Sequence, residues 1–510
     1  MQFKRKPWAH QLKAVRQAES LHDYGLFFEQ GTGKTATAIH LIRSKFNQAG
    51  RILRVLIFTL PLPIPQWREE WIQNSNIDTR LLVPLYGPGA KRLKTFNAQA
   101  WEQGHSFSAG EPRSVIFITN YESLLMKDLY RAFTEWEPDV IVFDESHKCK
   151  SHSAQRSKLA YDLANPHPKS PRKKPFTYLL TGTPVLNSPM DLFQQFKILD
   201  GGQTFGWNYF SFRAKYFRDR NAGMPKDRYF PKWEIMSLAK DGRNATGEIQ
   251  QLISAKSMRV LKSDCLDLPP EVSVPVKVGM SKEQTRIYNE LRKEFVTYYN
   301  SKACIATLAI TKALRLMQIT SGFISTESPG EADGERILHT LPGTPKEAAL
   351  EELLQEICVE QGHKVLVWAV FKPNYEFIKA VCDRLKIKYI EVHGGVSEGK
   401  KRANVEAFKT QDDISVFVGH PGSGGIGLNL TVAPYSIFYS RTFSLEHYLQ
   451  ARARNHRGGS KEAGHSSITH YDLVCEGTIE EIAVEKLANK EEMSENLLSQ
   501  MVEELVRQDG

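Results

Sequence analysis

The sequence predicts an α/β fold built from two successive lobes, and three observations support this prediction. Short apolar segments rich in Val, Ile and Phe alternate with amphipathic stretches, as buried parallel strands do when helices cover both faces of their sheet. These segments form two groups, the first ending with "TYLLTGT" and the second beginning with "KVLVWAV". The chain has 510 residues, which is long enough for two domains with separate cores.

Each group of apolar segments supplies the strands of one mainly parallel sheet. The expected strands are "RVLIFT", "SVIFIT", "DVIVFDES" and "TYLLTGT", then "KVLVWAV", "YIEVHG", "ISVFVGH", "SIFYS" and "ITHYDLV". The paired prolines of "LDLPPEVS" stiffen the chain between the groups and mark the junction of the lobes. We therefore expect a first lobe over 1–265, a linker over 266–280, a second lobe over 281–475 with a helical insertion at about 281–345, and a terminal helix over 476–510.

The composition is that of a globular protein with a basic charge balance. Hydrophobic residues make up 41% and charged residues 25% of the chain, and the formal net charge is +9. This charge favours a polyanionic partner, above all nucleic acid, although such a balance alone is weak evidence. The six cysteines form no CxxC pair, so neither a zinc site nor a disulfide framework is expected. Without an export signal or a run of ~18 apolar residues, we expect a cytoplasmic protein with no membrane partner, associated with the nucleoid or with a virus in an infected cell.

The segment "FFEQGTGKTATAIHLI" is a candidate phosphate-binding loop that opens a helix. Glycines let backbone amides approach phosphates, the lysine reaches the β- and γ-phosphate oxygens, and the threonine that follows it can bind magnesium. The segment departs from the general GxxxxGK[ST] pattern because Phe28 stands in place of the first glycine. The candidate cofactor-binding residues are Gly31, Thr32, Gly33, Lys34 and Thr35.

The segment "VIVFDESHK" brings two carboxylates to the end of an apolar strand. Charge at such a position is costly unless it is compensated, and a magnesium ion is a natural compensation. We expect Asp144 to hold the metal and Glu145 to orient and polarise the attacking water. The alternative is an acidic pair that only caps the next helix.

Two weaker signals flank these motifs. The segment "YLLTGTPVLNS" places Thr181 and Thr183 around a glycine at another strand end, and we interpret it as a relay that senses the state of the nucleotide. The alternative is a simple strand-to-turn element bent at Pro184. In "PWAHQLKAV", Gln11 carries an amide able to read adenine through paired hydrogen bonds, although a lone glutamine can equally be a surface helix residue.

The segment "QARARNHRGG" concentrates positive charge far from the phosphate-binding loop. In a helix over 444–458, capped by the serine at its start and ended by the glycine, Gln450, Arg454 and Arg457 share one face, and Arg452 points the opposite way. Guanidinium groups on one face are suited to polydentate anion contacts. A solvated basic helix is the alternative.

Together these motifs, in this order, resemble the motif series of superfamily-two helicases. Further matching segments are "TLPLPIPQW", "ITNYESL", "VHGGVSEGKKRANVEAF" and "GSGGIGLNLT", and the forms "TGTPVLNS", "LPPEV" and "QARARNHR" resemble the Swi/Snf-type branch. The resemblance implies two tandem RecA-like lobes that bind ATP and Mg²⁺ between them, with a C-terminal brace helix. It also implies an adenine contact from Gln11, arginine fingers at Arg454 and Arg457, and Gln450 beside them. The family's usual "HRIGQ" ending is replaced here by "HRGGS".

The resemblance implies a nucleic-acid path that grips phosphates without reading bases. The positions that match the family's strand-contacting motifs are Pro61, Thr119, Asn120, Tyr121, Phe371, Ser423, Gly424, Gly425, Asn429 and Thr431.

The implied function is that of a nucleic-acid-dependent ATPase, a monomeric motor that translocates along double-stranded DNA beside replication, recombination or restriction proteins. One alternative is a strand-separating or annealing helicase that acts at forks or on RNA. A second is an ATPase-inactive nucleic-acid-binding scaffold, and a third is a motor subunit that serves a separate nuclease or methyltransferase.

Overall fold

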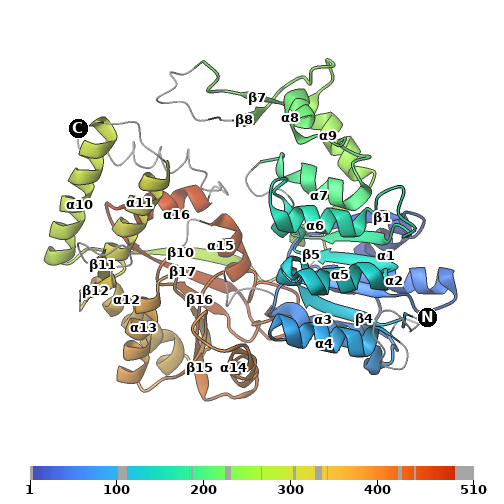
Figure 1. Cartoon of the computed structure of the whole chain (residues 1–510). Helices are drawn as coiled ribbons and strands as arrows, with labels where there is room; N and C mark the ends of the chain where they lie inside the picture. Colours follow the sequence, from blue (N-terminus) through green and yellow to red (C-terminus); the bar gives the residue numbers. More distant parts are fainter. Residues whose placement is uncertain are drawn as a thin grey trace. The chain divides into compact units, whose positions relative to one another are not determined.

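The computed structural model describes residues 4–101, 112–182, 184, 188–223, 231, 233–265, 267–301, 306–327, 336–341, 343–422, 428–441 and 444–488. The chain divides into two compact units (Figure 1), unit 1 with Met1–Arg220 and Pro231–Leu266, and unit 2 with Asn221–Phe230 and Asp267–Gly510. Within the described ranges, no helix has the length and apolar character needed to cross a bilayer.

Unit 1 is built on a seven-stranded sheet in which all neighbouring strands are parallel, in the order β3-β4-β2-β5-β6-β1-β9. Its strands are β1 (Asp23–Phe28), β2 (Val55–Thr59), β3 (Leu82–Pro84), β4 (Ile116–Asn120), β5 (Val140–Asp144), β6 (Phe176–Leu180) and β9 (Ser257–Val260). Residues of each strand alternate between two apolar clusters. In β2, Leu56 and Phe58 belong to one cluster, and Val55 and Ile57 belong to the other. Helices therefore cover both faces of the sheet.

The helices of unit 1 separate by face. The cluster that contains Val55 is covered by α1 (Ala9–Ala18), α2 (Lys34–Ala49) and α3 (Pro63–Asn74). The cluster that contains Leu56 is covered by α4 (Gly89–Ala100), α5 (Lys127–Trp136), α6 (Gln155–Ala164) and α7 (Asp191–Asp200). The same cluster extends into α8 (Tyr209–Tyr216) and α9 (Ala245–Ser254), near the antiparallel pair β7 (Phe217–Asp219) and β8 (Trp233–Ile235).

Unit 2 contains a six-stranded sheet, again parallel throughout, in the order β10-β17-β16-β13-β15-β14. Its strands are β10 (Glu271–Val278), β13 (Val365–Trp368), β14 (Lys388–Val392), β15 (Ile414–Gly419), β16 (Tyr435–Phe438) and β17 (Ile468–Cys475). One face packs on α12 (Pro345–Leu354) and α13 (Lys372–Arg384), and the other packs on α14 (Glu398–Thr410) and α15 (Leu445–Arg452). A satellite cluster joins α10 (Lys282–Ser301), α11 (Ala306–Thr320) and α16 (Ile479–Ala488), and β11 (Phe323–Glu327) pairs with β12 (Arg336–Thr340).

These two α/β lobes with parallel sheets confirm the predicted fold class of tandem RecA-like lobes with small helical insertions. One local feature differs from the expectation, because most of the predicted linker over 266–280 forms strand β10. This strand pairs with β17 along its whole length. It lies at the sheet edge, where Pro275 is tolerated because one side of an edge strand needs no hydrogen-bond donor. The C-terminal helix is present as α16, and the rest of the predicted terminal helix lies outside the described residues.

Candidate nucleotide-binding site

The predicted phosphate-binding loop connects β1 to α2. Strand β1 ends at Phe28, and α2 begins at Lys34 with Gly33 as its N-cap in the left-handed conformation (φ 82°). Gly31 also has a positive φ of 87°. A side chain at Gly33 would be strained by this positive φ, and its Cβ atom would lie 2.1 Å from Nε2 of Gln11, so the Gln11 amide would have to move.

Hydrogen bonds from side chains fix the loop at the N-terminus of α2. Lys34 Nζ donates to the carbonyl of Phe28 (2.8 Å), and the Thr32 hydroxyl donates to that of Glu29 (2.7 Å). Nε2 of His10 lies 2.8 Å from the Thr32 carbonyl. The first amides of a helix lack intrahelical partners and carry partial positive charge. This backbone cradle, with a lysine at its edge, has the chemistry needed to hold phosphates.

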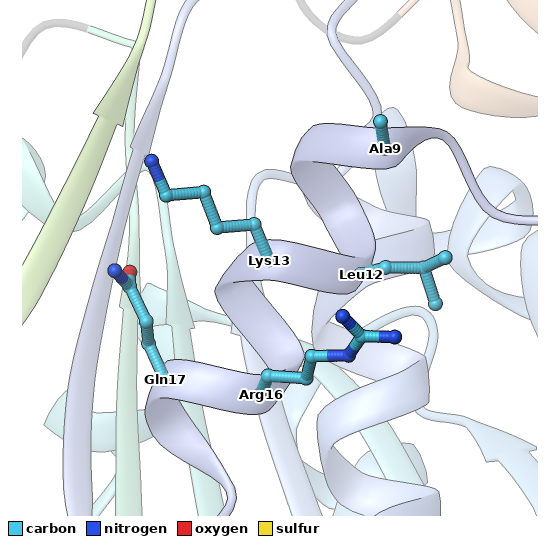
Figure 2. A pocket seen from close by; sticks show the side chains of 5 residues that line it. All are labelled: Ala9, Leu12, Lys13, Arg16 and Gln17. Carbon is cyan, nitrogen blue, oxygen red and sulfur yellow. The ribbon is translucent and has the colours of Figure 1, made fainter.

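Gln11 lies against this loop rather than on the surface. Its Oε1 accepts from the backbone N–H of Trp8 (2.8 Å), and its Nε2 donates to the Gly33 carbonyl (3.3 Å). The alternative of a surface helix residue is therefore wrong. Figure 2 shows the other face of α1, where a hollow is lined by Ala9, Leu12, Lys13, Arg16 and Gln17. These residues recur at spacings of three and four and so share one face of α1, whereas Gln11 falls on the opposite face.

Asp144 is the last residue of β5, and three donors hold its buried carboxylate. The Thr59 hydroxyl and the Trp67 indole N–H both donate to Oδ2 at 2.8 Å, and the backbone N–H of Glu145 donates to Oδ1 (3.1 Å). Burial raises the pKa of Asp144 to about 6, and the charge of Glu145 adds to this rise. The Trp67 hydrogen bond, the charge of Lys34 and the Thr59 hydrogen bond oppose it. Strands β1 and β5 both pair in parallel with β6, so the phosphate loop that follows β1 and Asp144 at the end of β5 lie at the same edge of the sheet.

Glu145 has a strained backbone and a carboxylate in a confined position. Its φ of 55° and ψ of 51° are uncommon for a residue with a side chain. Its buried Oε2 accepts no hydrogen bond from the described residues and lies 3.4 Å from Nδ1 of His147. The 3₁₀ helix Ser146–Cys149 that follows has no side-chain cap, so the alternative of a helix-capping pair is wrong.

The donor set is compatible with magnesium but not with a metal cage made only of protein. Within the described ranges, no three His, Cys, Asp or Glu side chains form a group able to hold a metal. Magnesium commonly uses one or two carboxylates together with substrate phosphates and water. Asp144 beside the phosphate loop fits that mode of binding, and Thr35 lies in the first turn of α2.

The segment after β6 contacts the acidic motif directly. The buried Thr181 hydroxyl lies 3.1 Å from Nδ1 of His147. The Ser146 hydroxyl donates to Oε1 of Gln195 (2.8 Å), and Nε2 of Gln195 donates to the Pro184 carbonyl (2.7 Å). Thr183, the second predicted relay residue, lies outside the described residues. The contacts made by His147 and Gln195 were not expected from the sequence, because no local pattern marks them.

The arginine segment of unit 2 differs from the single helix that its spacing predicts. Ser444 caps α15 as expected, since its hydroxyl accepts from the N–H of His447 (3.2 Å). The helix nevertheless ends at Arg452, and the prediction that it reaches Gly458 is wrong. The Arg454 carbonyl accepts from the N–H of Leu430 (3.0 Å) instead of continuing the helical pattern. Contacts with a distant segment therefore override the local helical preference.

The two arginines predicted for the site, Arg454 and Arg457, nevertheless bond to the same backbone carbonyl. Nη1 of Arg454 and Nη1 of Arg457 donate to the same acceptor, the carbonyl of Leu428, at 3.3 and 3.0 Å. Arg452 points elsewhere and pairs with Glu271 (3.0 Å). Gln450 is buried, and its amide donates to Glu446 (2.9 Å) within α15.

The residues predicted to contact nucleic acid have unequal exposure. Pro61 and Asn429 are exposed, Phe371 and Thr431 are partly buried, and Asn120 is buried, where it accepts from Arg92. Ser423, Gly424 and Gly425 lie outside the described residues.

Two of these predictions require correction. Thr119 and Tyr121 are completely buried, and their hydroxyls bond to Ser123 and to the Asp144 carbonyl. Their side chains pack inside unit 1 and offer no exposed surface for a nucleic-acid strand. Trp67, whose segment also matched a strand-contacting motif, instead holds Asp144.

Two known domain families match this chain. The SNF2-related domain matches residues 10–322, and the helicase conserved C-terminal domain matches residues 345–459. The CHD3-type chromatin-remodeling factor PICKLE of Arabidopsis thaliana is 22% identical over 92% of this chain and 32% of its own length. The human DNA annealing helicase and endonuclease ZRANB3 is 24% identical over 94% of this chain and 39% of its own length.

A relative of similar length comes from a phage. Protein p41 of Acyrthosiphon pisum secondary endosymbiont phage 1 is 23% identical over 98% of this chain and 99% of its own length. By contrast, this chain spans only about a third of PICKLE and two fifths of ZRANB3.

Proposed function

The chain belongs to the SNF2-related family, a family of nucleic-acid-dependent ATPases, and we propose that it is a motor that moves along double-stranded DNA as it hydrolyses ATP. The observation that carries the proposal is that the phosphate loop of Gly33 and Lys34 follows β1 at the same sheet edge where Asp144 and Glu145 follow β5. The first lobe, over 1–265, would hold the nucleotide, and the second lobe, over 281–475, would supply the arginines.

Each residue of the site then has a defined task. The amides of the Gly31–Gly33 turn and the Lys34 ammonium bind the phosphates, and Gln11 orients the adenine. Thr35 and Asp144 hold magnesium, which neutralises charge on the phosphates when it is bound. Glu145 positions the attacking water.

The arginines of unit 2 complete the proposed chemistry. Arg454 and Arg457 act on the transferred phosphoryl group, and Gln450 supports their segment. Catalysis of this kind is mostly positioning and charge stabilisation, because the transferred group develops negative charge on its oxygens.

The proposed DNA contacts are independent of sequence. The exposed or partly exposed residues Pro61, Phe371, Asn429 and Thr431 are proposed to contact phosphates, with Asn120, Ser423, Gly424 and Gly425 as further candidates. The net charge of +9 supports a polyanionic partner. We propose action in the cytoplasm as a monomeric motor, and the similarity to p41 along its whole length supports a phage or bacterial setting.

A direct test compares ATPase stimulation by single-stranded, double-stranded and forked DNA and by RNA, with triplex displacement measured beside strand separation. The proposal expects the strongest stimulation by duplex and displacement of the third strand without unwinding. Unwinding without displacement would favour the helicase alternative, which the similarity to an annealing helicase also supports. Stimulation by none of these polymers would support the inactive scaffold.

A variant tests the arginine assignment. Arg457→Ala should retain ATP binding but lose on the order of 10³-fold in turnover, the lower end of arginine-finger effects. Arg384→Ala is the matched control, since it removes an exposed arginine of unit 2 that pairs with Glu351. Near-normal turnover of the Arg457 variant would refute the role.

A further inference from the structure

Glu271, the first residue of β10, contacts residues on both sides of Arg454 in the turn that follows α15. Glu271 accepts from Nε of Arg452 (3.0 Å), and its other oxygen lies 3.4 Å from Nδ1 of His456. The buried His470 of β17 contacts the same carboxylate (2.9 Å). Arg452 precedes and His456 follows Arg454, so one carboxylate spans the turn that presents this arginine.

The residues just before β10 extend these contacts. Nε2 of His456 lies 3.0 Å from the Pro269 carbonyl, and Lys461 forms an ion pair with Asp267. The segment Asp267–Glu271 is the start of unit 2 where the chain leaves unit 1 at Leu266. The junction of the lobes in the sequence is therefore attached to the turn between Arg452 and Lys461.

The electrostatic balance shows that Glu271 is held as a carboxylate. Burial acts to raise its pKa, but the hydrogen bond from His470 and the charges of Arg452, His470 and His456 outweigh burial and hold the pKa well below its usual range. The side chain is 29% exposed, at the sheet edge, and belongs to no apolar cluster. Its contacts therefore orient neighbouring groups rather than fill a core.

The two sides of the turn are held by different partners. Arg454 and Arg457 donate to Leu428, whereas Arg452 and His456 face Glu271. We infer that Glu271 is a positioning residue that fixes the turn carrying Arg454 and Arg457 and links its placement to the lobe junction at Asp267–Pro270. This inference rests on the proposed role of those arginines in ATP hydrolysis.

The test is a comparison of kinetic parameters in the full-length protein. Glu271→Gln keeps the size of the side chain and removes its charge. DNA-stimulated kcat should fall on the order of 10²-fold, as expected when a reacting group moves by about 1 Å. The affinities for ATP and DNA should stay within about twofold, because the nucleotide loop lies in unit 1 and the backbone of β10 is unchanged. Glu271→Asp, which restores the charge, should recover part of the loss.

A double variant separates positioning from general damage. If Glu271 acts only through the arginines, Glu271→Gln should cause little further loss when Arg457 is already alanine. Lys277→Ala is the matched control, because it removes the ion pair with Glu481 at the other end of β10. Its kcat should match that of the wild type.

The outcomes are distinguishable. An unchanged kcat in Glu271→Gln, or an equal fractional loss in both backgrounds, would overturn the inference. Normal turnover of Arg457→Ala alone would instead refute the arginine role proposed above, and a lack of stimulation by any nucleic acid would refute the proposed motor. If Glu271→Gln does not fold, Arg452→Gln breaks the same contact from the other side and must show the same lack of additivity.

Discussion

Replacing Asp144 by asparagine should stabilise the protein while it abolishes ATP hydrolysis. The native carboxylate is buried at the end of β5, where burial raises its pKa from 3.8 to about 6. An ionised Asp144 therefore opposes folding at neutral pH in the absence of metal. Asparagine removes the charge at nearly constant volume.

The magnitude follows from the two pKa values and the hydrogen bonds. The difference between 3.8 and about 6 corresponds to about 3 kcal/mol of folding free energy once the pH exceeds both values. The asparagine oxygen can still accept from Thr59 and Trp67, which share one acceptor atom. Its NH₂ group would face the N–H of Glu145, and losing that bond costs about 1 kcal/mol. The expected net gain is about 2 kcal/mol.

The sign of the pH dependence provides the assay. Below about pH 4, Asp144 is protonated in both folded and unfolded chains, so its penalty is absent. The destabilisation of the folded state by ionised Asp144 grows as the pH rises from 4 to 6 and reaches its full value above pH 6. Urea unfolding of unit 1 in EDTA should therefore show a stability advantage of Asp144→Asn at pH 8 that shrinks in acid.

A second aspartate beside β5 gives a control of opposite sign. Burial acts to raise the pKa of Asp139, but hydrogen bonds from Arg54 and Arg51 outweigh it, and the pKa is lowered. Asp139→Asn should destabilise the protein at pH 8, and this loss should fade in acid as the carboxylate becomes protonated. No gain for Asp144→Asn at pH 8, or a gain equal at pH 4 and pH 8, would refute the reasoning.

Three further predictions concern the phosphate loop, the buried relay and DNA binding. Gly33→Ala should weaken ATP binding measured by calorimetry, because a Cβ is strained at this positive φ and would displace the Gln11 amide; wild-type affinity would contradict the proposed cradle. Gln195→Leu should cost about 2–3 kcal/mol in urea unfolding, since it leaves the Ser146 hydroxyl and the Pro184 carbonyl without this partner. DNA-stimulated ATPase should fall steeply between 50 and 200 mM salt, because a protein that makes about six phosphate contacts loses roughly 10³-fold in DNA affinity over this range. Stimulation independent of salt would argue against a grip on phosphates.

The sequence predicts the parts of the site that are encoded locally. A glycine–lysine loop between a strand and a helix, and a carboxylate pair at the end of an apolar strand, have a defined geometry once the strand is recognised. Lys34 and Asp144 could therefore be identified before the fold was known. Their proximity also follows, because both lie just beyond the carboxyl ends of parallel strands in one sheet.

Other features depend on contacts between distant segments, which no local pattern encodes. Trp67 lies in a helix after a loop, and only the packing of α3 brings its indole to Asp144. The helix expected to reach Gly458 ends early because Leu430 bonds to the Arg454 carbonyl. The linker prediction likewise relied on the paired prolines Pro269 and Pro270, whereas only pairing with the distant strand β17 shows that the residues after them form β10.

The cations of the proposed site have a common arrangement in the two units. Lys34 donates to the carbonyl of Phe28, and Arg454 and Arg457 donate to that of Leu428. A carbonyl is a neutral acceptor, whereas an anionic phosphate oxygen adds an attraction between opposite charges to the hydrogen bond. Exchange of the carbonyl for a phosphate oxygen is therefore favourable. It requires little further desolvation of the cation, because the cation is already partly buried. In the role inferred for Glu271, its contacts with Arg452 and His456 add an attachment on either side of Arg454.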